Sequence, residues 1–287
     1  MNLAERKVLN LLHSKKVTTD EGADLIDAIR AQIDAPTKGS RLTSKFKGDS
    51  RLQSQLDDDM AEAAAHDGHL LVEGERGTGK MMISRTIHYN SNRADKQILA
   101  LDATSELVEE ELFGVESGKK GERPKRGLLD VCRGGTVVLD MMPHLPPATQ
   151  KKLYAFLETG QFKRVNGTKT CSSDVRVVGL SNPGFSEHME EGRFDKDLFD
   201  KLAQNTILAP ALRDRLEDLP ALVQHFVSVQ SQSDARIAPG VPEEVLAKLT
   251  NHDWPGNVME LSQVVMDAVA NCNDDVLAAE DVKVGED

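Results

Sequence analysis

Residues 74–80 have the types and spacing of a loop that binds phosphate. The loop consists of Gly74, Glu75, Arg76, Gly77, Thr78, Gly79 and Lys80, which fit the pattern GxxxxGK. Glycines in such a loop let backbone N–H groups turn toward a phosphate, and the lysine reaches the β- and γ-phosphates. The next position normally carries a Ser or Thr hydroxyl for Mg²⁺, and here it is Met81. We therefore expect ATP or ADP as the cofactor, with weak binding of Mg²⁺.

Four short apolar runs with β-branched residues predict the strands that position this loop. They cover residues 69–74, 97–103, 136–142 and 174–182, and helices are expected at 80–90, 106–113 and 148–158. This alternation predicts an α/β fold with a doubly wound parallel sheet, covered by helices on both faces. Asp140 lies near the end of the third predicted strand, where a carboxylate can hold Mg²⁺ beside the phosphates.

The rest of the chain is predicted to be helical. Residues 3 to about 33 form two short amphipathic segments, and a hairpin of that size must dock on this chain or on a partner to be stable. Apolar spacing after about residue 210 is helical throughout. We divide the chain into a helical hairpin and possible interaction module at 1–33, a linker at 34–47, an α/β nucleotide-binding domain at 48–209 and a helical domain at 210–287.

Composition excludes several classes of protein. An apolar share of 39% over 287 residues argues against disorder throughout, and a net charge of −12 opposes binding of a phosphate backbone without a local basic patch. No apolar run is long enough to cross a membrane, and charges occupy the N-terminal stretch where a signal peptide would be apolar. The three cysteines form no CxxC pair. We expect a cytoplasmic protein with free thiols.

Several motifs together resemble one family. GERGTGK, ELFG, GGTVVLD, KLYAFLETGQFKRVNG, DVRVVGLSN, ALRDRLEDLPALVQHF and WPGNVMEL occur in the order seen in the AAA+ domain of bacterial sigma-54-dependent transcription activators. The resemblance runs from about Gly48 to Asp281. It implies a nucleotide-binding α/β domain with a C-terminal helical lid, assembled as a ring with ATP at subunit interfaces. It also implies that Asn182 is the polar sensor of that family.

The departures from the family fall on its catalytic positions. The glutamate that orients the attacking water is replaced by Met141, and the two interface arginines are replaced by Asp195 and Lys201. The lid arginine that senses nucleotide is replaced by Met259. Arg193 precedes Asp195 by two positions, about 200° around a helix, so we do not expect it to substitute. These replacements predict a degenerate AAA+ protein.

The partner-binding loop of the family is also altered. Its GAFTGA sequence is absent, and residues 118–127 instead carry five cations, Lys119, Lys120, Arg123, Lys125 and Arg126. This segment is either a solvated loop or a contact for an acidic protein surface or polyanion. Only 33 residues follow Trp254, which is too few for an added helix-turn-helix domain, so we expect no intrinsic DNA-binding domain.

Three functional hypotheses remain at this point. The first is an ATP-binding protein with little or no hydrolysis that acts as a regulatory or assembly module through protein partners, including AAA+ homo- or hetero-oligomers. The second is an active AAA+ ATPase that remodels a transcription or other complex, either alone or within a hetero-ring, because Lys80, Asp140 and Asn182 are retained. The third is a structural protein that binds no nucleotide.

Overall fold

The computed structural model describes residues 48–285, apart from 49, 118–123, 236 and 273. The predicted hairpin at 1–33, the linker at 34–47 and most of the cations of the basic segment lie outside the described residues. Their predicted roles therefore stay predictions.

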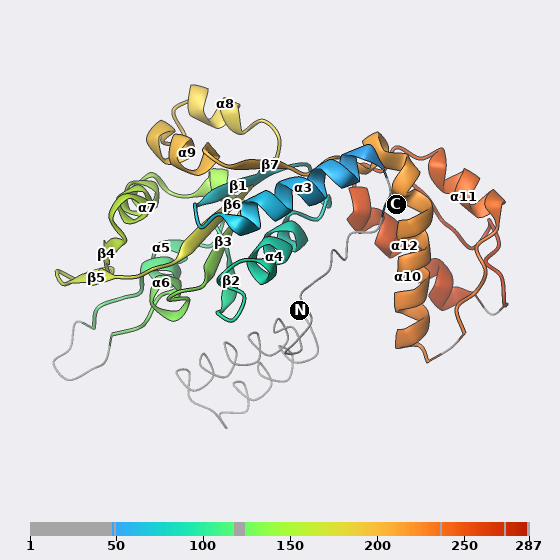
Figure 1. The fold of residues 1–287 in the computed structure, drawn as a ribbon, viewed down its shortest axis with the longest axis horizontal. Helices are drawn as coiled ribbons and strands as arrows, with labels where there is room; N and C mark the ends of the chain where they lie inside the picture. The colour runs from blue at the N-terminus through green and yellow to red at the C-terminus, as the bar shows by residue number, and fades with distance from the viewer. Residues whose placement is uncertain (1–47, 49, 118–123, 236, 273, 286–287) are drawn as a thin grey trace.

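A five-stranded parallel sheet forms the centre of the fold (Figure 1). Its strand order is β2-β3-β6-β1-β7, and the strands are β1 (Leu70–Glu73), β2 (Ile98–Asp102), β3 (Thr136–Asp140), β6 (Arg176–Ser181) and β7 (Thr206–Leu208). The register places Val72 opposite Leu180 and opposite Ile207. Because all strands run the same way, their carboxyl ends, with the loops that follow, meet at one edge of the sheet.

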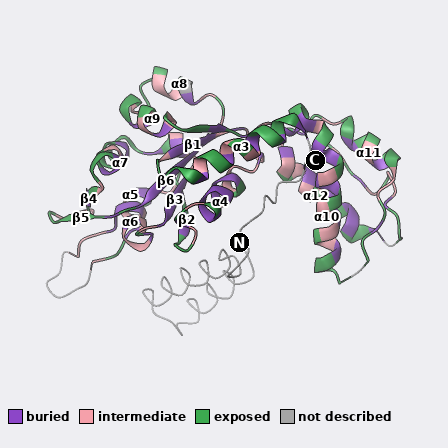
Figure 2. Cartoon of the chain, in the orientation of Figure 1, coloured by how far each residue is buried: buried purple, intermediate pink, exposed green. Residues whose placement is uncertain are grey.

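Alternate residues of each strand enter cores on opposite faces of the sheet. Leu71, Val137 and Val177 pack on one face, and Leu70, Val138 and Val178 pack on the other. The first face is covered by α5 (Val108–Phe113), α6 (Leu128–Val131), α7 (Pro147–Thr159) and α9 (Lys196–Ala203), and the second by α3 (Arg51–Ala65) and α4 (Lys80–Asn90). Figure 2 shows the strands buried between these helices. The predicted α/β fold with a parallel sheet is confirmed.

The helical part of the chain follows β7. It contains the 3-10 segment η2 (Leu212–Asp218) and the helices α10 (Leu219–Ser233), α11 (Glu243–Thr250) and α12 (Asn257–Asn271), packed around the buried Trp254. Helix α3 begins beside η2, since the Ser50 N–H and hydroxyl donate to the Asp218 carboxylate at 2.8 and 2.7 Å. The two parts of the chain stand side by side in Figure 1.

Some elements were not predicted from the sequence. They are α3, α6, the edge strand β7, the antiparallel pair β4 (Gln161–Lys163) and β5 (Thr170–Ser172), the helix α8 (Phe185–Glu190) and the 3-10 turn η1 (Met142–His144). The strand predicted at 136–142 ends at Asp140, because Met141 adopts a left-handed conformation with φ of 52°. None of the described helices is long and apolar enough to span a bilayer.

Candidate functional site

The predicted phosphate loop connects β1 to α4 at the carboxyl edge of the sheet. Gly77 and Gly79 have φ of 81° and 100°, which L side chains rarely adopt, so glycine is needed at both positions. Gly79 is the N-cap of α4, and because glycine has no side chain, no side-chain hydrogen bond caps the first turn of that helix. The N-terminus of an 11-residue helix therefore stands at the end of the loop, with a partial positive charge that favours a phosphate.

Lys80 is held inside this loop by three acceptors. Its Nζ donates to the carbonyls of Gly74 at 2.7 Å and Glu75 at 2.9 Å, and to Asn182 Oδ1 at 3.0 Å. Asn182 follows β6, which pairs directly with β1, so the sheet brings together residues that are 102 positions apart. Burial lowers the pKa of Lys80, while Asp140 and Glu75 act in the opposite direction. The lysine is thus fixed as a point charge where the loop turns.

Asp140 ends β3, next to β6 in the sheet. Its carboxylate accepts a hydrogen bond from the Met141 N–H at 2.9 Å. No group of three or more His, Cys, Asp or Glu side chains suited to a metal occurs among the residues the structure describes. A Mg²⁺ ion held through Asp140 would therefore take its other ligands from water and phosphate oxygens, as Mg²⁺ commonly does.

The helical part of the chain contacts the phosphate loop through Glu75. Arg213, at the start of η2, donates to both oxygens of the Glu75 carboxylate at 2.5 and 2.8 Å, and Asn257 Nδ2 donates to it at 3.1 Å. These hydrogen bonds, first from Arg213 and then from Asn257, lower the pKa of Glu75 to about 2. Asn257 also donates to the Arg76 carbonyl at 2.9 Å and is fully buried. Sequence reasoning missed Arg213 and Asn257 as neighbours of the loop.

Met259 lies directly above the loop. Its N–H donates to the Gly77 carbonyl at 3.2 Å, while 62% of the residue is exposed. A Cβ atom on Gly77 would overlap the Gly256 carbonyl oxygen and approach the Met259 Cβ. The position is therefore close to the phosphate loop, but a thioether replaces the arginine that the family resemblance implies there.

Asp195 and Lys201 make contacts within their own chain. Asp195 is the N-cap of α9, and its Oδ1 accepts from the Leu198 N–H at 3.0 Å. Lys201 forms an ion pair at 2.5 Å with Glu158 of α7. The expectation that Arg193 and Asp195 lie on one helix is wrong, because α9 begins only at Lys196.

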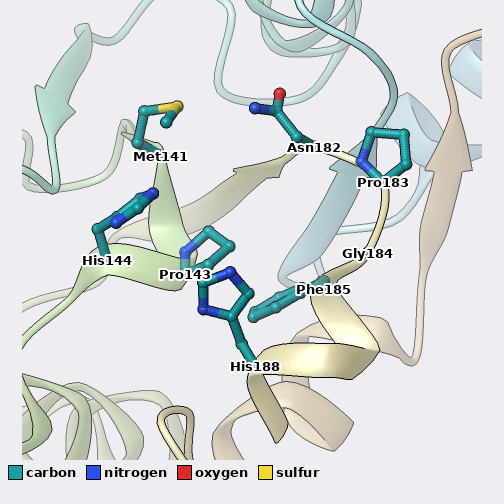
Figure 3. A pocket seen from close by; sticks show the side chains of 8 residues that line it. All are labelled: Met141, Pro143, His144, Asn182, Pro183, Gly184, Phe185 and His188. Carbon is teal, nitrogen blue, oxygen red and sulfur yellow. The ribbon is translucent and has the colours of Figure 1, made fainter. Parts of the chain in front are cut away.

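A pocket of about 210 Å³ adjoins Asn182 (Figure 3). It is lined by Met141, Pro143, His144, Asn182, Pro183, Gly184, Phe185 and His188. Met141 and Asn182 face it from the ends of neighbouring strands, and His188 faces it from α8. Met141, which directly follows Asp140, therefore lines the same pocket as Asn182.

The described part of the basic segment lies against the β4–β5 region. Val115 pairs with both Lys125 and Val165 through backbone bridges. The side chains of Lys125, Arg126, Lys163 and Lys169 are exposed there. Arg164 is engaged by Asp130 at 2.8 Å and by Glu116 at 3.5 Å. Exposed cations from two segments therefore gather at one end of an acidic protein.

Comparison with known proteins identifies the family. The profile of the Sigma-54 interaction domain matches residues 46–208, more than half of the chain. The chain belongs to the Sigma-54 interaction domain family. The profile of the AAA+ ATPase lid domain matches residues 213–284, which contain α10, α11 and α12. We use the word lid for these residues.

Curated relatives and solved structures agree with this assignment. Regulatory protein AtoC of Escherichia coli is 34% identical over 78% of this chain and 50% of its own length. The DNA-binding transcriptional activator HyfR of E. coli is 36% identical over 77% of this chain and 34% of its own length. This chain thus spans half or less of these two relatives. The structure of NtrX from Brucella abortus in complex with ATP has a TM-score of 0.78 and 28% identity, covering 91% of this chain and 60% of NtrX.

Proposed function

We propose that this Sigma-54 interaction domain protein binds ATP or ADP between its phosphate loop and its lid, with little or no hydrolysis. It acts as a regulatory or assembly module in transcription, through protein partners. The observation that carries the proposal is the contrast between Lys80, which is bound to Gly74, Glu75 and Asn182, and Met141, which stands beside Asp140. The first is a group that binds phosphate, and the second cannot act as a base.

Binding is supported by the loop and by a relative. Residues 74–80 join a strand to a helix N-terminus, and both glycines with positive φ are in place. NtrX, with 28% identity, has been solved with ATP and with ADP. Lys80, Asp140 and the backbone N–H groups of the loop act on phosphate and Mg²⁺ in the ground state, so they support affinity without supporting hydrolysis. Bound Mg²⁺ would neutralise phosphate charge.

Loss of hydrolysis is supported by three side chains. A positioned general base contributes about 10²- to 10⁴-fold in rate, and the Met141 thioether cannot polarise water. An arginine supplied to the phosphate contributes about 10³- to 10⁵-fold. Asp195 instead caps α9, and Lys201 pairs with Glu158. These losses do not multiply, because groups that act as a unit are non-additive, but either one alone removes most of the turnover.

Partner binding is proposed at two segments of the chain. The exposed cations of residues 124–126 and 163–169 suit an acidic protein surface, and the hairpin at 1–33 is the second candidate contact. We place this protein in AAA+ homo- or hetero-oligomers on the strength of its family. The retained Lys80, Asp140 and Asn182 favour one second candidate, an active ATPase whose missing groups are supplied by a different subunit in a hetero-ring.

Equilibrium binding of a fluorescent ATP analogue with Mg²⁺ tests the proposal. Wild-type protein should bind, and Lys80→Ala should weaken binding by about 10- to 100-fold, as expected for loss of a hydrogen bond from a charged group. Lys151→Ala, an exposed lysine on α7, is the matched control and should bind as wild type does. Absence of binding by the wild type would instead favour a structural protein without nucleotide, and equal binding by Lys80→Ala would contradict the phosphate-loop site.

A further inference from the structure

Two histidines from different elements lie next to each other in the lining of the pocket beside Asn182. His144 ends η1 and His188 lies on α8, and their ring centroids are 5.9 Å apart at an interplanar angle of 75°. Both line the pocket of about 210 Å³, together with Met141 and Asn182 (Figure 3). The two imidazoles are therefore close together and open to the same space.

The two rings contact each other and have electrostatic neighbours, but neither has a hydrogen-bond partner among the described residues. Other histidines differ in this respect: His69 Nδ1 accepts from the Val177 N–H, His88 contacts Thr136 and the Lys96 carbonyl, and His252 pairs with Glu260. The ring nitrogens of His144 and His188 are thus available to an external ligand.

The spacing of the rings suits one metal ion. With Zn–N bonds of about 2.0–2.1 Å, two imidazoles on a single ion have their centroids roughly 5–6 Å apart. The observed 5.9 Å lies at the upper end of this range. The Met141 thioether and the Asn182 amide line the remaining wall. These are weak ligands, which leave the other coordination positions to water.

Charged groups of both signs lie around the two rings. Burial, then Arg193 and His144, lower the pKa of His188. Glu187 and Glu191 act on the same ring in the opposite direction, and Arg193 is itself paired with Glu191. On the other side, Asp102 at the end of β2 interacts electrostatically with His144. Carboxylates from two elements therefore flank the pair.

We propose that His144 and His188 form a binding site for a transition-metal dication of the zinc class, with its remaining positions open to water. Imidazole is a preferred ligand of Zn²⁺, Ni²⁺ and Cu²⁺, and two of them from separate elements chelate one ion. The site is distinct from the Mg²⁺ position at Asp140, because its donors are nitrogens rather than oxygens. The site does not depend on nucleotide binding, so its test is independent of the test of the proposed function.

Calorimetric titration of the full chain with Zn²⁺ alone, in a buffer free of chelators and phosphate, tests the site. Wild type should bind one Zn²⁺. His144→Gln and His188→Gln should each weaken that binding by at least about tenfold, because the loss of even a residue that only supports a metal ligand costs about that much affinity. The affinity of the double variant for Zn²⁺ should be close to that of either single variant, because the one imidazole left in a single variant cannot chelate the ion. His66→Gln, an exposed histidine at the end of α3, is the matched control.

Three results would overturn the proposal. They are the absence of a Zn²⁺ site in the wild type, unchanged affinity in His144→Gln or in His188→Gln, and an equal loss in His66→Gln. Circular-dichroism melting checks that each variant is folded. His144 is exposed and makes no hydrogen bond to the described protein, so its replacement tests the site even if His188→Gln proves unstable.

Discussion

Asn182 lies between two regions of the site that are built differently. On the phosphate-loop side, Lys80 and Glu75 each hold several partners, and the lid contacts the loop through Arg213 and Asn257. On the other side, Met141 faces an open pocket. Under the proposed function, the first region contains groups that bind phosphate in the ground state, and the second lacks the groups that act in the transition state. Affinity and turnover would then be lost separately on one fold.

Restoring a base at position 141 should have the largest effect. Met141→Glu places a carboxylate beside Asp140 and should raise ATP turnover, with about 10²- to 10⁴-fold, the contribution of a positioned general base, as the upper limit. The gain should fall short of that limit, because Asp195 and Lys201 still occupy the arginine positions and groups that act as a unit are non-additive. Met141→Gln has a similar shape without a base and should leave turnover unchanged. Phosphate release under steady-state conditions measures both variants. Equal turnover in the two variants would show that the second region lacks more than a base.

Asp195 should contribute to stability rather than to nucleotide binding. Asp195→Ala removes the N-cap of α9 and should lower the free energy of unfolding by about 1 kcal/mol. Asp195→Asn keeps the cap and should be close to wild type. Urea melts measure these changes, and nucleotide affinity should be unaltered in both variants. If Asp195→Ala lowered nucleotide affinity as much as Lys80→Ala does, Asp195 would act at the nucleotide. That result would contradict a purely structural role for Asp195.

The contact between Glu75 and Arg213 should have the smallest effect. Both side chains are partly exposed, so their pairing contributes little, and Glu75→Gln or Arg213→Gln should weaken nucleotide binding by less than about tenfold. Because the two residues act through one contact, the double variant should be no weaker than the weaker single variant. Binding of the fluorescent analogue to all four proteins measures this. Additive losses would mean that the two residues act independently.

Much of the fold could be predicted from the sequence because its signals are local. The four longest strands of the parallel sheet are apolar and contain β-branched residues, and the glycines before Lys80 lie within seven residues. The edge strand β7 was missed because only one of its three residues is buried. The β4–β5 pair was missed for the same reason, since it exposes most of its side chains.

The candidate site could be predicted only in part. Lys80 follows from the GxxxxGK pattern, Asp140 from its place near the end of a predicted strand, and Asn182 from the family resemblance. The contacts of Arg213 and Asn257 with Glu75 join residues 138 and 182 positions apart, and nothing in local spacing indicates them. Likewise, the capping role of Asp195 depends on where α9 begins, which the sequence alone placed wrongly for Arg193.

The central claim is that this protein binds ATP without hydrolysing it at the rate of an ordinary AAA+ enzyme. The most direct test is steady-state ATP turnover over a range of protein concentrations, with Lys80→Ala as the control for contaminating activity. We predict no turnover above that control at any concentration at which the analogue is bound. Turnover that depends on Lys80 and rises with protein concentration would contradict the claim and show that assembly completes the active site.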